Sequence, residues 1–290
     1  MPVAGRAALQ KQVFRGSVAL EQRLLTRGEL RTKAWRRLRS DVYCDAALPL
    51  THRLQARGVA LVAPDEAVFG GLTAAVLWGA RDLAGADDAV EVVLPPGLRW
   101  HPAPGVVVRT AAIAGEVVTD GELRWTSRTR TALDLIRRGT LDDAVVLLDQ
   151  LVQADVVELA PVRAAAAALP RCRGSRQARQ AAELADGLAQ SPQETRLRLV
   201  IARSDLPMPL AQYRVTARGR FVARVDFGYP DQRLAIEYDG LWHGEPQQVG
   251  PDRDRLNRLL AAGWRVLFVT AADLWRPERL VARIAAALAA

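Results

Sequence analysis

Residues 221–240 read FVARVDFGYPDQRLAIEYDG, and this stretch decides how the C-terminal third of the chain is interpreted. It contains two β-rich runs with acids towards their ends: Asp226 in the first, Glu237 and Asp239 in the second. Because strand side chains alternate between faces, Glu237 and Asp239 point the same way, and Asp226 joins them if the two strands pair. Three convergent carboxylates predict a site for Mg²⁺ or Mn²⁺, metals that activate water and neutralise charge on a phosphodiester.

The sequence on either side predicts a complete small domain over residues 191–290. Ser191 and Glu194 mark a helix start as its N-cap and first-turn acid, with a proline at the first helical position. After this helix we expect strands at 211–216, 221–227 and 233–238, a helix at 252–262 and a strand at 264–270. The predicted order is αβββαβ, a mixed sheet flanked by helices.

The first 57 residues predict a basic DNA-binding domain. Apolar spacing indicates a helix at 18–25, and Thr26 with Glu29 form a capping box that begins the next one. We expect a basic helix at 32–39, followed by a strand or wing at 41–45. That helix would carry Lys33, Arg36, Arg37 and Arg39. An arrangement of a helix, a turn, a basic second helix and a wing places cations against DNA phosphates and the major groove. The alternative is a basic helix that faces only solvent.

The middle segment, residues 58–190, lacks the spacing of metal ligands or of a catalytic nucleophile. Its apolar and β-branched patterns predict a helix at 66–78, strands at 90–94, 106–109 and 122–126, and helices at 129–137, 141–154, 158–169 and 175–189. We interpret it as a scaffold or interaction segment. The predicted fold class is therefore multi-domain, α+β and α/β.

Charge and composition restrict the partners. The 290 residues carry 40 Lys and Arg against 32 Asp and Glu, a net charge of +8, and the segments 1–57, 58–190 and 191–290 carry +8, −4 and +4. Such an excess favours a polyanionic partner, DNA above all.

Lys11 and Lys33 are the only lysines, so no lysine is present to serve a site near the C-terminus. Without an apolar run long enough for a bilayer or a signal peptide, we expect a cytoplasmic protein with no membrane contact.

Residues 191–274 resemble the PD-(D/E)XK nuclease superfamily, in particular the branch of very-short-patch repair endonucleases. Asp226 matches the first acid of the motif and Glu237 the second, while Asp239 stands where the usual lysine would be. GLWHG at 240–244 and the helix–strand run at 252–274 are similar to the closing elements of that branch. The resemblance implies that metal-bound water, rather than a lysine, carries the activation of the nucleophile.

The resemblance also implies roles for individual residues. Glu194 matches an acid on the first helix and would complete a second or outer metal position. His243 is the candidate general acid or base, with a loop-shaping hydrogen bond as the alternative. Trp242 would wedge between base steps or else pack in the core. On the last helix, Arg253, Arg255 and Arg258 would contact phosphates or line a solvated face.

The remaining segments resemble the abortive-infection type IV antitoxins. Residues 13–46 are similar to their N-terminal winged helix, and FGGLTAAVLWGA at 69–80 with RWTSRTRTALDL at 124–135 to the domain that follows. In that family the first segment binds DNA and the next serves regulation or partner contact. The partners implied are DNA, a toxin or another defence or repair protein, and a second copy of the chain.

These observations predict a Mg²⁺- or Mn²⁺-dependent DNA endonuclease that is targeted by its N-terminal module. A non-catalytic transcriptional regulator or antitoxin-like protein with a degenerate nuclease domain is the alternative, because the motif lysine is missing. A third interpretation is an interaction component of a defence or repair system, with the middle segment as its interface.

Overall fold

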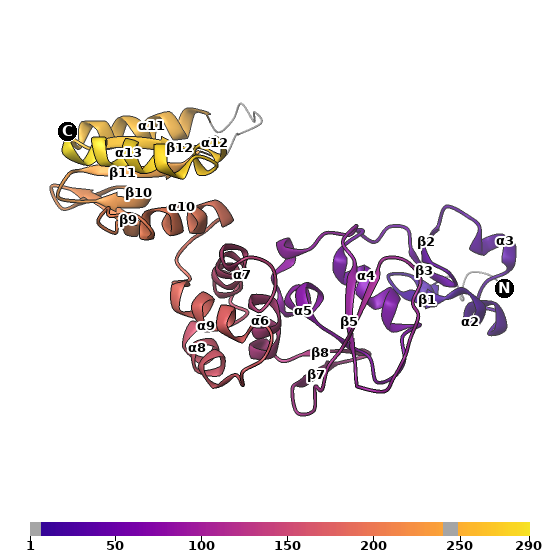
Figure 1. Ribbon diagram of the computed structural model, residues 1–290. Coiled ribbons are helices and arrows are strands. Elements are labelled where there is room, and N and C mark those ends of the chain that lie inside the picture. Colours follow the sequence, from indigo (N-terminus) through magenta and orange to yellow (C-terminus); the bar gives the residue numbers. More distant parts are fainter. Residues whose placement is uncertain (1–6, 240–248) are drawn as a thin grey trace. The chain divides into compact units, whose positions relative to one another are not determined.

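A computed structural model describes residues 7–239 and 249–290, and the side chains of 7–239 and 253–290. The chain divides into two compact units that interleave in sequence (Figure 1). The first unit comprises Met1–Arg138 and Ala154–Cys172, and the second comprises Gly139–Gln153 and Arg173–Ala290. The predicted boundary after residue 57 falls within the first unit, and the one after residue 190 falls within the second.

The first unit contains two sheets and several short helices. Its first half consists of β1 (Val13–Arg15), α2 (Gly16–Glu21), α3 (Arg27–Leu30), β2 (Trp35–Arg39), β3 (Val42–Asp45), α4 (His52–Ala60), β4 (Val68–Phe69) and α5 (Gly71–Trp78). Its second half consists of a 3-10 turn (Arg81–Leu83), β5 (Val90–Leu94), β6 (Val106–Thr110), β7 (Val117–Asp120), β8 (Leu123–Thr126), α6 (Arg128–Ile136) and α8 (Leu159–Ala168). The sheet orders are β1-β3-β2 and β6-β5-β4-β8-β7.

The predicted basic helix at 32–39 is wrong, because this segment is the strand β2. It pairs antiparallel with β3, from Trp35 opposite Asp45 to Arg39 opposite Val42. Trp35 is buried and meets the ring of Phe14 edge-on at 5.2 Å. The turn is closed by Asp41, whose backbone is left-handed (φ 58°). Burial of Trp35 and strand pairing thus override the helix propensity of the arginines. The Thr26–Glu29 capping box is confirmed at the start of α3.

The predicted helix at 66–78 is also shorter than expected. Val68 and Phe69 form β4, which pairs with both β5 and β8, and the helix α5 begins only at Gly71. The other predicted strands and helices of the middle segment are confirmed to within a few residues, apart from the last, which ends at Leu184 rather than 189.

From residue 192 to residue 269 the second unit confirms the predicted αβββαβ order, and two further helices that were not predicted follow it. It contains α7 (Leu141–Gln153), α9 (Ser175–Leu184), α10 (Pro192–Ala202), β9 (Leu210–Ala217), β10 (Arg220–Tyr229), β11 (Leu234–Tyr238), α11 (Val249–Ala261), β12 (Arg265–Val269), α12 (Ala271–Leu274) and α13 (Pro277–Ala289). The sheet order is β12-β11-β10-β9, with β11 parallel to β12 and the other pairs antiparallel.

Helices cover both faces of this four-stranded sheet, as Figure 1 shows for α10, α11 and α13. On one face Leu197 of α10 and Leu280 of α13 pack against Phe227 and Ile236. On the other face Leu259 of α11 packs with Val225 and Ala235. The sheet is therefore buried between helices, and polar side chains gather where its central strands end. In the described part of the chain, no helix is both long and apolar enough to cross a bilayer.

Candidate active site

Asp226 lies at the point where β10 and β11 stop pairing. The ladder between the two strands runs from Tyr229 opposite Leu234 to Phe227 opposite Ile236. Asp226 is the residue before Phe227 on β10, and its carboxylate accepts a hydrogen bond from the backbone N–H of Tyr238 at 2.8 Å. An acidic side chain thus occupies the end of the ladder, close to Glu237 on the neighbouring strand.

Glu194 reaches the same region from the first turn of α10. Ser191 caps the helix: the Glu194 N–H donates to Ser191 Oγ (3.2 Å), and Ser191 Oγ donates to Glu194 Oε1 (2.9 Å). The second oxygen, Oε2, accepts Gln190 N–H and Gln212 Nε2, both at 2.9 Å. Glu194 therefore holds the start of α10 against β9 while its carboxylate faces the site.

Glu194 is buried and Asp226 is half-buried. Burial raises the pKa of Asp226 above its usual value, although the Tyr238 N–H and the charges of Arg255 and Arg224 act in the opposite direction. Burial also raises the pKa of Glu194, and the nearby Asp226 carboxylate adds to that rise. The Asp226 carboxylate thus disfavours the ionisation of the buried Glu194, and positive charge nearby would relieve this effect.

Glu237 has a different environment, because an arginine holds it. The residue is 6% exposed, and its carboxylate pairs with both terminal nitrogens of Arg255, with Nη1 at 2.7 Å from Oε1 and Nη2 on Oε2. The same Nη1 also donates to the backbone carbonyl of Arg224 at 3.0 Å. Arg255 was predicted as a phosphate contact or as part of a solvated face; in the structure its guanidinium lies on Glu237, and the phosphate contact stays a prediction.

Asp239 stands just beyond β11, exposed, with its N–H on the carbonyl of Val269 at 2.7 Å. Among the residues that the structure describes, no three or more His, Cys, Asp or Glu side chains are grouped so as to hold a metal ion. Asp226, Glu237 and Asp239 are thus not held as one ligand group, since Tyr238 binds the first, Arg255 the second, and the third faces solvent.

Trp242 and His243 lie outside the described residues. Two residues that the sequence analysis did not name belong to the site: Gln212, on Glu194, and Gln190, which accepts a hydrogen bond from Arg224 Nη2 at 2.7 Å. Neutral amides carry no pattern of charge or spacing that would have identified them. Gln212 does have one signal in the structure, a left-handed backbone (φ 50°) within a strand.

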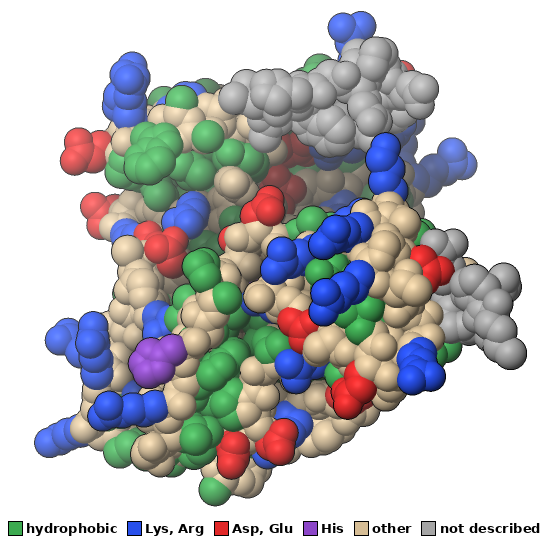
Figure 2. Space-filling model, turned by 90° about the vertical axis from the view of Figure 1, so that its right-hand side faces the viewer, with side chains coloured by type: hydrophobic (Ala, Val, Ile, Leu, Met, Phe, Trp, Pro, Cys, Tyr) green, Lys and Arg blue, Asp and Glu red, His purple; other side chains and the backbone are tan. Residues whose placement is uncertain are grey.

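The predicted DNA-binding cations of the first unit lie on and beside β2. Arg36 donates to the carbonyls of Ala46 and Leu48, both at 3.0 Å, and Arg39 donates to Gln55 at 3.3 Å. Burial lowers the pKa of Arg39. Lys33 and Arg37 remain exposed. Figure 2 shows basic side chains interspersed with acidic and apolar ones on one face of the molecule, without one continuous basic surface.

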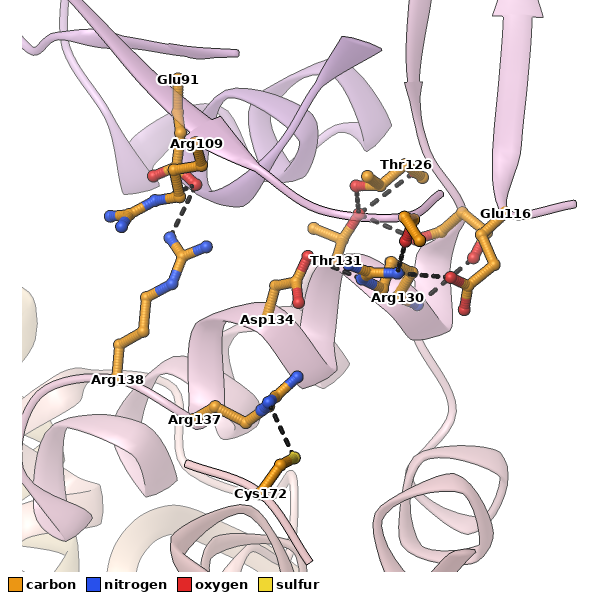
Figure 3. A network of polar contacts seen from close by, with 12 residues as sticks. Glu91, Arg109, Glu116, Thr126, Arg130, Thr131, Asp134, Arg137, Arg138 and Cys172 are labelled. Carbon is orange, nitrogen blue, oxygen red and sulfur yellow. Dashed lines mark hydrogen bonds and ion pairs between the residues drawn. The ribbon is translucent and has the colours of Figure 1, made fainter. Parts of the chain in front are cut away.

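A second network of charged groups lies in the first unit and links α6 to its sheet (Figure 3). Glu91 pairs with Arg109 (Nε–Oε1, 3.0 Å) and Arg138 (Nη1–Oε1, 2.6 Å). Arg130 lies between Asp134 (2.8 Å) and Glu116 (2.5 Å). Because every one of these acids has an arginine partner, the network has the character of a structural connection rather than of a metal site.

Comparison with known proteins identifies relatives but no activity. No family model matches the chain. Two curated proteins of Mycobacterium tuberculosis, "Uncharacterized protein MT2308" of strain CDC 1551 / Oshkosh and "Uncharacterized protein Rv2248" of strain ATCC 25618 / H37Rv, are each 33% identical to it over 225 residues, which is 76% of this chain and 83% of theirs. Among solved structures, the crystal structure of the RV2827C protein from Mycobacterium tuberculosis covers 74% of this chain and 86% of its own at 16% identity, with a TM-score of 0.41. By its identity and coverage, the chain belongs to the family of the mycobacterial proteins MT2308 and Rv2248.

Proposed function

We propose that this protein is a metal-dependent DNA endonuclease whose second unit carries the active site. The observation that carries the proposal is the position of Asp226 at the end of the β10–β11 ladder, with Glu194 and Glu237 beside it. The αβββαβ order and the mixed sheet are consistent with the nuclease resemblance of residues 191–274.

The proposed ligands for Mg²⁺ or Mn²⁺ are Asp226, Glu194 and Glu237. The bound metal would supply a more acidic water and neutralise negative charge on the phosphodiester. The chain's own part is to hold the carboxylates: Tyr238 N–H fixes Asp226, and Ser191 and Gln212 fix Glu194. Arg224 and Arg255 would provide the positive charge that attracts the DNA backbone, in a domain that has no lysine.

The N-terminal module is proposed to direct the enzyme to DNA. The order β1, α2, α3, β2, β3 supports a winged-helix arrangement in which the helix after the turn is α3 rather than residues 32–39. Arg27, Arg31, Lys33 and Arg37 are its exposed cations in and after α3. Contacts of this kind bind phosphates and weaken as the salt concentration rises.

Incubation of the purified protein with supercoiled plasmid and Mg²⁺ or Mn²⁺ tests the proposal. We expect nicked or linear DNA, no cleavage in EDTA, and a loss of about a hundredfold or more in rate for Asp226→Ala and for Glu237→Ala, since a metal contributes several kcal/mol to such a transition state. Asp231→Ala is the matched control, because Asp231 is an exposed acid on the β10–β11 turn. Cleavage that survives both active-site substitutions would exclude this site as its source.

A non-catalytic DNA-binding regulator is the second candidate. The ion pair between Arg255 and Glu237 favours this candidate. The guanidinium supplies the positive charge that a metal ion would otherwise supply, so the site would be stable as a DNA-binding surface without metal. Such a protein binds duplex DNA equally well in EDTA and shows no saturable uptake of Mn²⁺ by calorimetry. The endonuclease differs in both measurements.

A further inference from the structure

The hairpin of β9 and β10 extends beyond the neighbouring strand of its sheet. Residues 220–228 of β10 pair with β9, whereas β11 pairs with β10 only at residues 227–229. Residues 213–225 therefore form a two-stranded ribbon with a free end, which we call the arginine ribbon. Its base lies next to Asp226, so the ribbon projects from the end of the sheet at which the candidate site lies.

The arginine ribbon has one apolar face and one basic face. Val215 and Val225 pack with Leu259 of α11. Arg214 and Arg224 stand directly opposite each other on the two strands, and both are exposed. Because neighbouring strand residues point to opposite faces, the ribbon rests its valines on the helix and turns its arginines outward.

The free end of the ribbon adds two further cations. Arg218 and Gly219 are both left-handed (φ 50° and 72°), which is the conformation of a two-residue hairpin turn. Arg218 and Arg220 on this turn are exposed. Residues 206–225 contain four arginines and no acidic residue, so this stretch carries as much positive charge as the net charge of residues 191–290.

Carboxylates of the protein do not neutralise this charge. Among the residues that the structure describes, none of the four arginines forms an ion pair. The Arg214 guanidinium lies over the ring of Phe221, at 4.7 Å from its centroid, and Arg224 donates to the neutral amide of Gln190 at 2.7 Å. Like charges that face each other across a strand pair repel, so Arg214 and Arg224 lower the stability of the ribbon until an anion lies between them.

We propose that the arginine ribbon binds the sugar–phosphate backbone of duplex DNA and holds it at the candidate site. This inference rests on the proposed function in taking DNA as the partner. A guanidinium binds a phosphate through two parallel hydrogen bonds, and a two-stranded ribbon is narrow enough to lie along a DNA groove. Phe221, which is 56% exposed, supports the Arg214 guanidinium from one side and leaves its edge free for phosphate oxygens.

Hydrogen bonds connect the base of the ribbon with the site. Arg224 donates to the side chain of Gln190, and the Gln190 N–H donates to Glu194 Oε2 at 2.9 Å. The carbonyl of Arg224 accepts Arg255 Nη1 at 3.0 Å, and the same nitrogen lies on Glu237. A DNA backbone that lies along the ribbon would therefore arrive beside the acids of the candidate site.

The test compares the full-length protein with a double variant, Arg218→Gln with Arg220→Gln, and with Arg265→Gln. Arg265 is the matched control, because it is an exposed arginine on the same sheet but lies at the start of β12, beside Leu234 at the other end. Fluorescence anisotropy measures binding to a labelled duplex in EDTA, between about 50 and 200 mM salt.

We expect the double variant to bind at least about tenfold more weakly than wild type near 0.1 M salt. The slope of log K against log salt should become smaller by about 2, because each lost phosphate contact removes about 0.9 from it. Arg265→Gln should keep the wild-type affinity and slope. A duplex of unrelated sequence should show the same loss, since phosphate contacts read no bases. Both substituted side chains are exposed, so the Tm of the double variant should be no lower than that of wild type.

The outcomes separate this inference from the proposed function. If the double variant keeps the affinity and salt slope of wild type, the ribbon does not bind DNA, and cleavage by wild type would leave the endonuclease standing. If Arg265→Gln loses as much as the double variant, the effect belongs to net charge and the inference fails. If binding depends on the ribbon but wild type cleaves no DNA with Mg²⁺ or Mn²⁺, the inference stands without the endonuclease. If wild type binds no DNA, both are overturned.

Discussion

At the scale of single residues, Asp226 shows how position in the fold changes the chemistry of a side chain. Its carboxylate is held by the Tyr238 N–H, and burial raises its pKa. At pH values above 3.8, the usual pKa of an aspartate, the folded protein therefore binds more protons than the unfolded chain does. The ionised Asp226 therefore lowers the stability of the folded state, and this penalty grows as the pH rises through that range.

Replacement of Asp226 by asparagine removes this penalty. In metal-free buffer, we expect the Tm of Asp226→Asn relative to wild type to increase as the pH rises above 3.8. One pKa unit corresponds to about 1.4 kcal/mol. Asp142→Asn is a control of opposite sign, because the hydrogen bond from Arg203 lowers the pKa of Asp142 and stabilises the folded state above 3.8. A Tm difference for Asp226→Asn that is independent of pH would contradict the raised pKa.

The acids of the site were predictable from sequence, whereas their partners were not. Strand alternation predicts Glu237 and Asp239 on one face and the strand ends predict Asp226 beside them, from local features alone; the structure leaves Asp239 exposed and does not hold the three as one group. Arg255 is 18 residues from Glu237 and Gln212 is 18 residues from Glu194. Contacts at such separations depend on how helices and strands pack, which no nearby pattern specifies.

At the scale of elements, α10 is joined to α7 by three ion pairs of very different burial. Arg198 binds Asp149 at 2.7 Å with both side chains almost fully buried. Asp149 also accepts the N–H groups of Asp186 and Gly187, at 3.0 and 2.8 Å. The other two pairs, Arg203–Asp142 and Arg196–Asp143, are substantially exposed.

Burial predicts the relative strength of these pairs. We expect Asp149→Ala to lower the free energy of unfolding by about 3–5 kcal/mol, because it removes the buried carboxylate from Arg198 and leaves that guanidinium with the more exposed Asp186. Asp142→Ala should lower it by less than about 1 kcal/mol, since water screens the exposed pair. Urea denaturation of the two variants measures both values, and equal losses would show that burial does not decide the contribution.

At the scale of the whole molecule, the division into two units places α7 and α9 with the C-terminal sheet rather than with the middle segment. The sequence pattern predicts that the C-terminal domain begins at residue 191, where Ser191 caps α10. The acids that pair with Arg198 of α10, Asp149 and Asp186, nevertheless precede residue 191 in the chain.

This arrangement predicts how fragments behave. A fragment of residues 139–290 should unfold cooperatively on heating, whereas one of residues 191–290 should be less stable by about 3 kcal/mol or more, because Arg198 loses its carboxylate partners. Circular dichroism during thermal unfolding makes the comparison. Equal midpoints for the two fragments would show that α7 and α9 do not contribute to the stability of the C-terminal unit.

The sequence by itself determined the αβββαβ order from α10 to β12, the capping box at Thr26, the N-cap at Ser191, and the presence of acids near the strand ends. These features follow from periodicity and from contacts within a few residues. Only the tertiary structure decided that residues 32–39 form a strand, that Arg255 binds Glu237, and that α7 and α9 support α10. Each depends on burial against a segment distant in sequence, where packing of Trp35 or pairing of a buried charge outweighs local propensity.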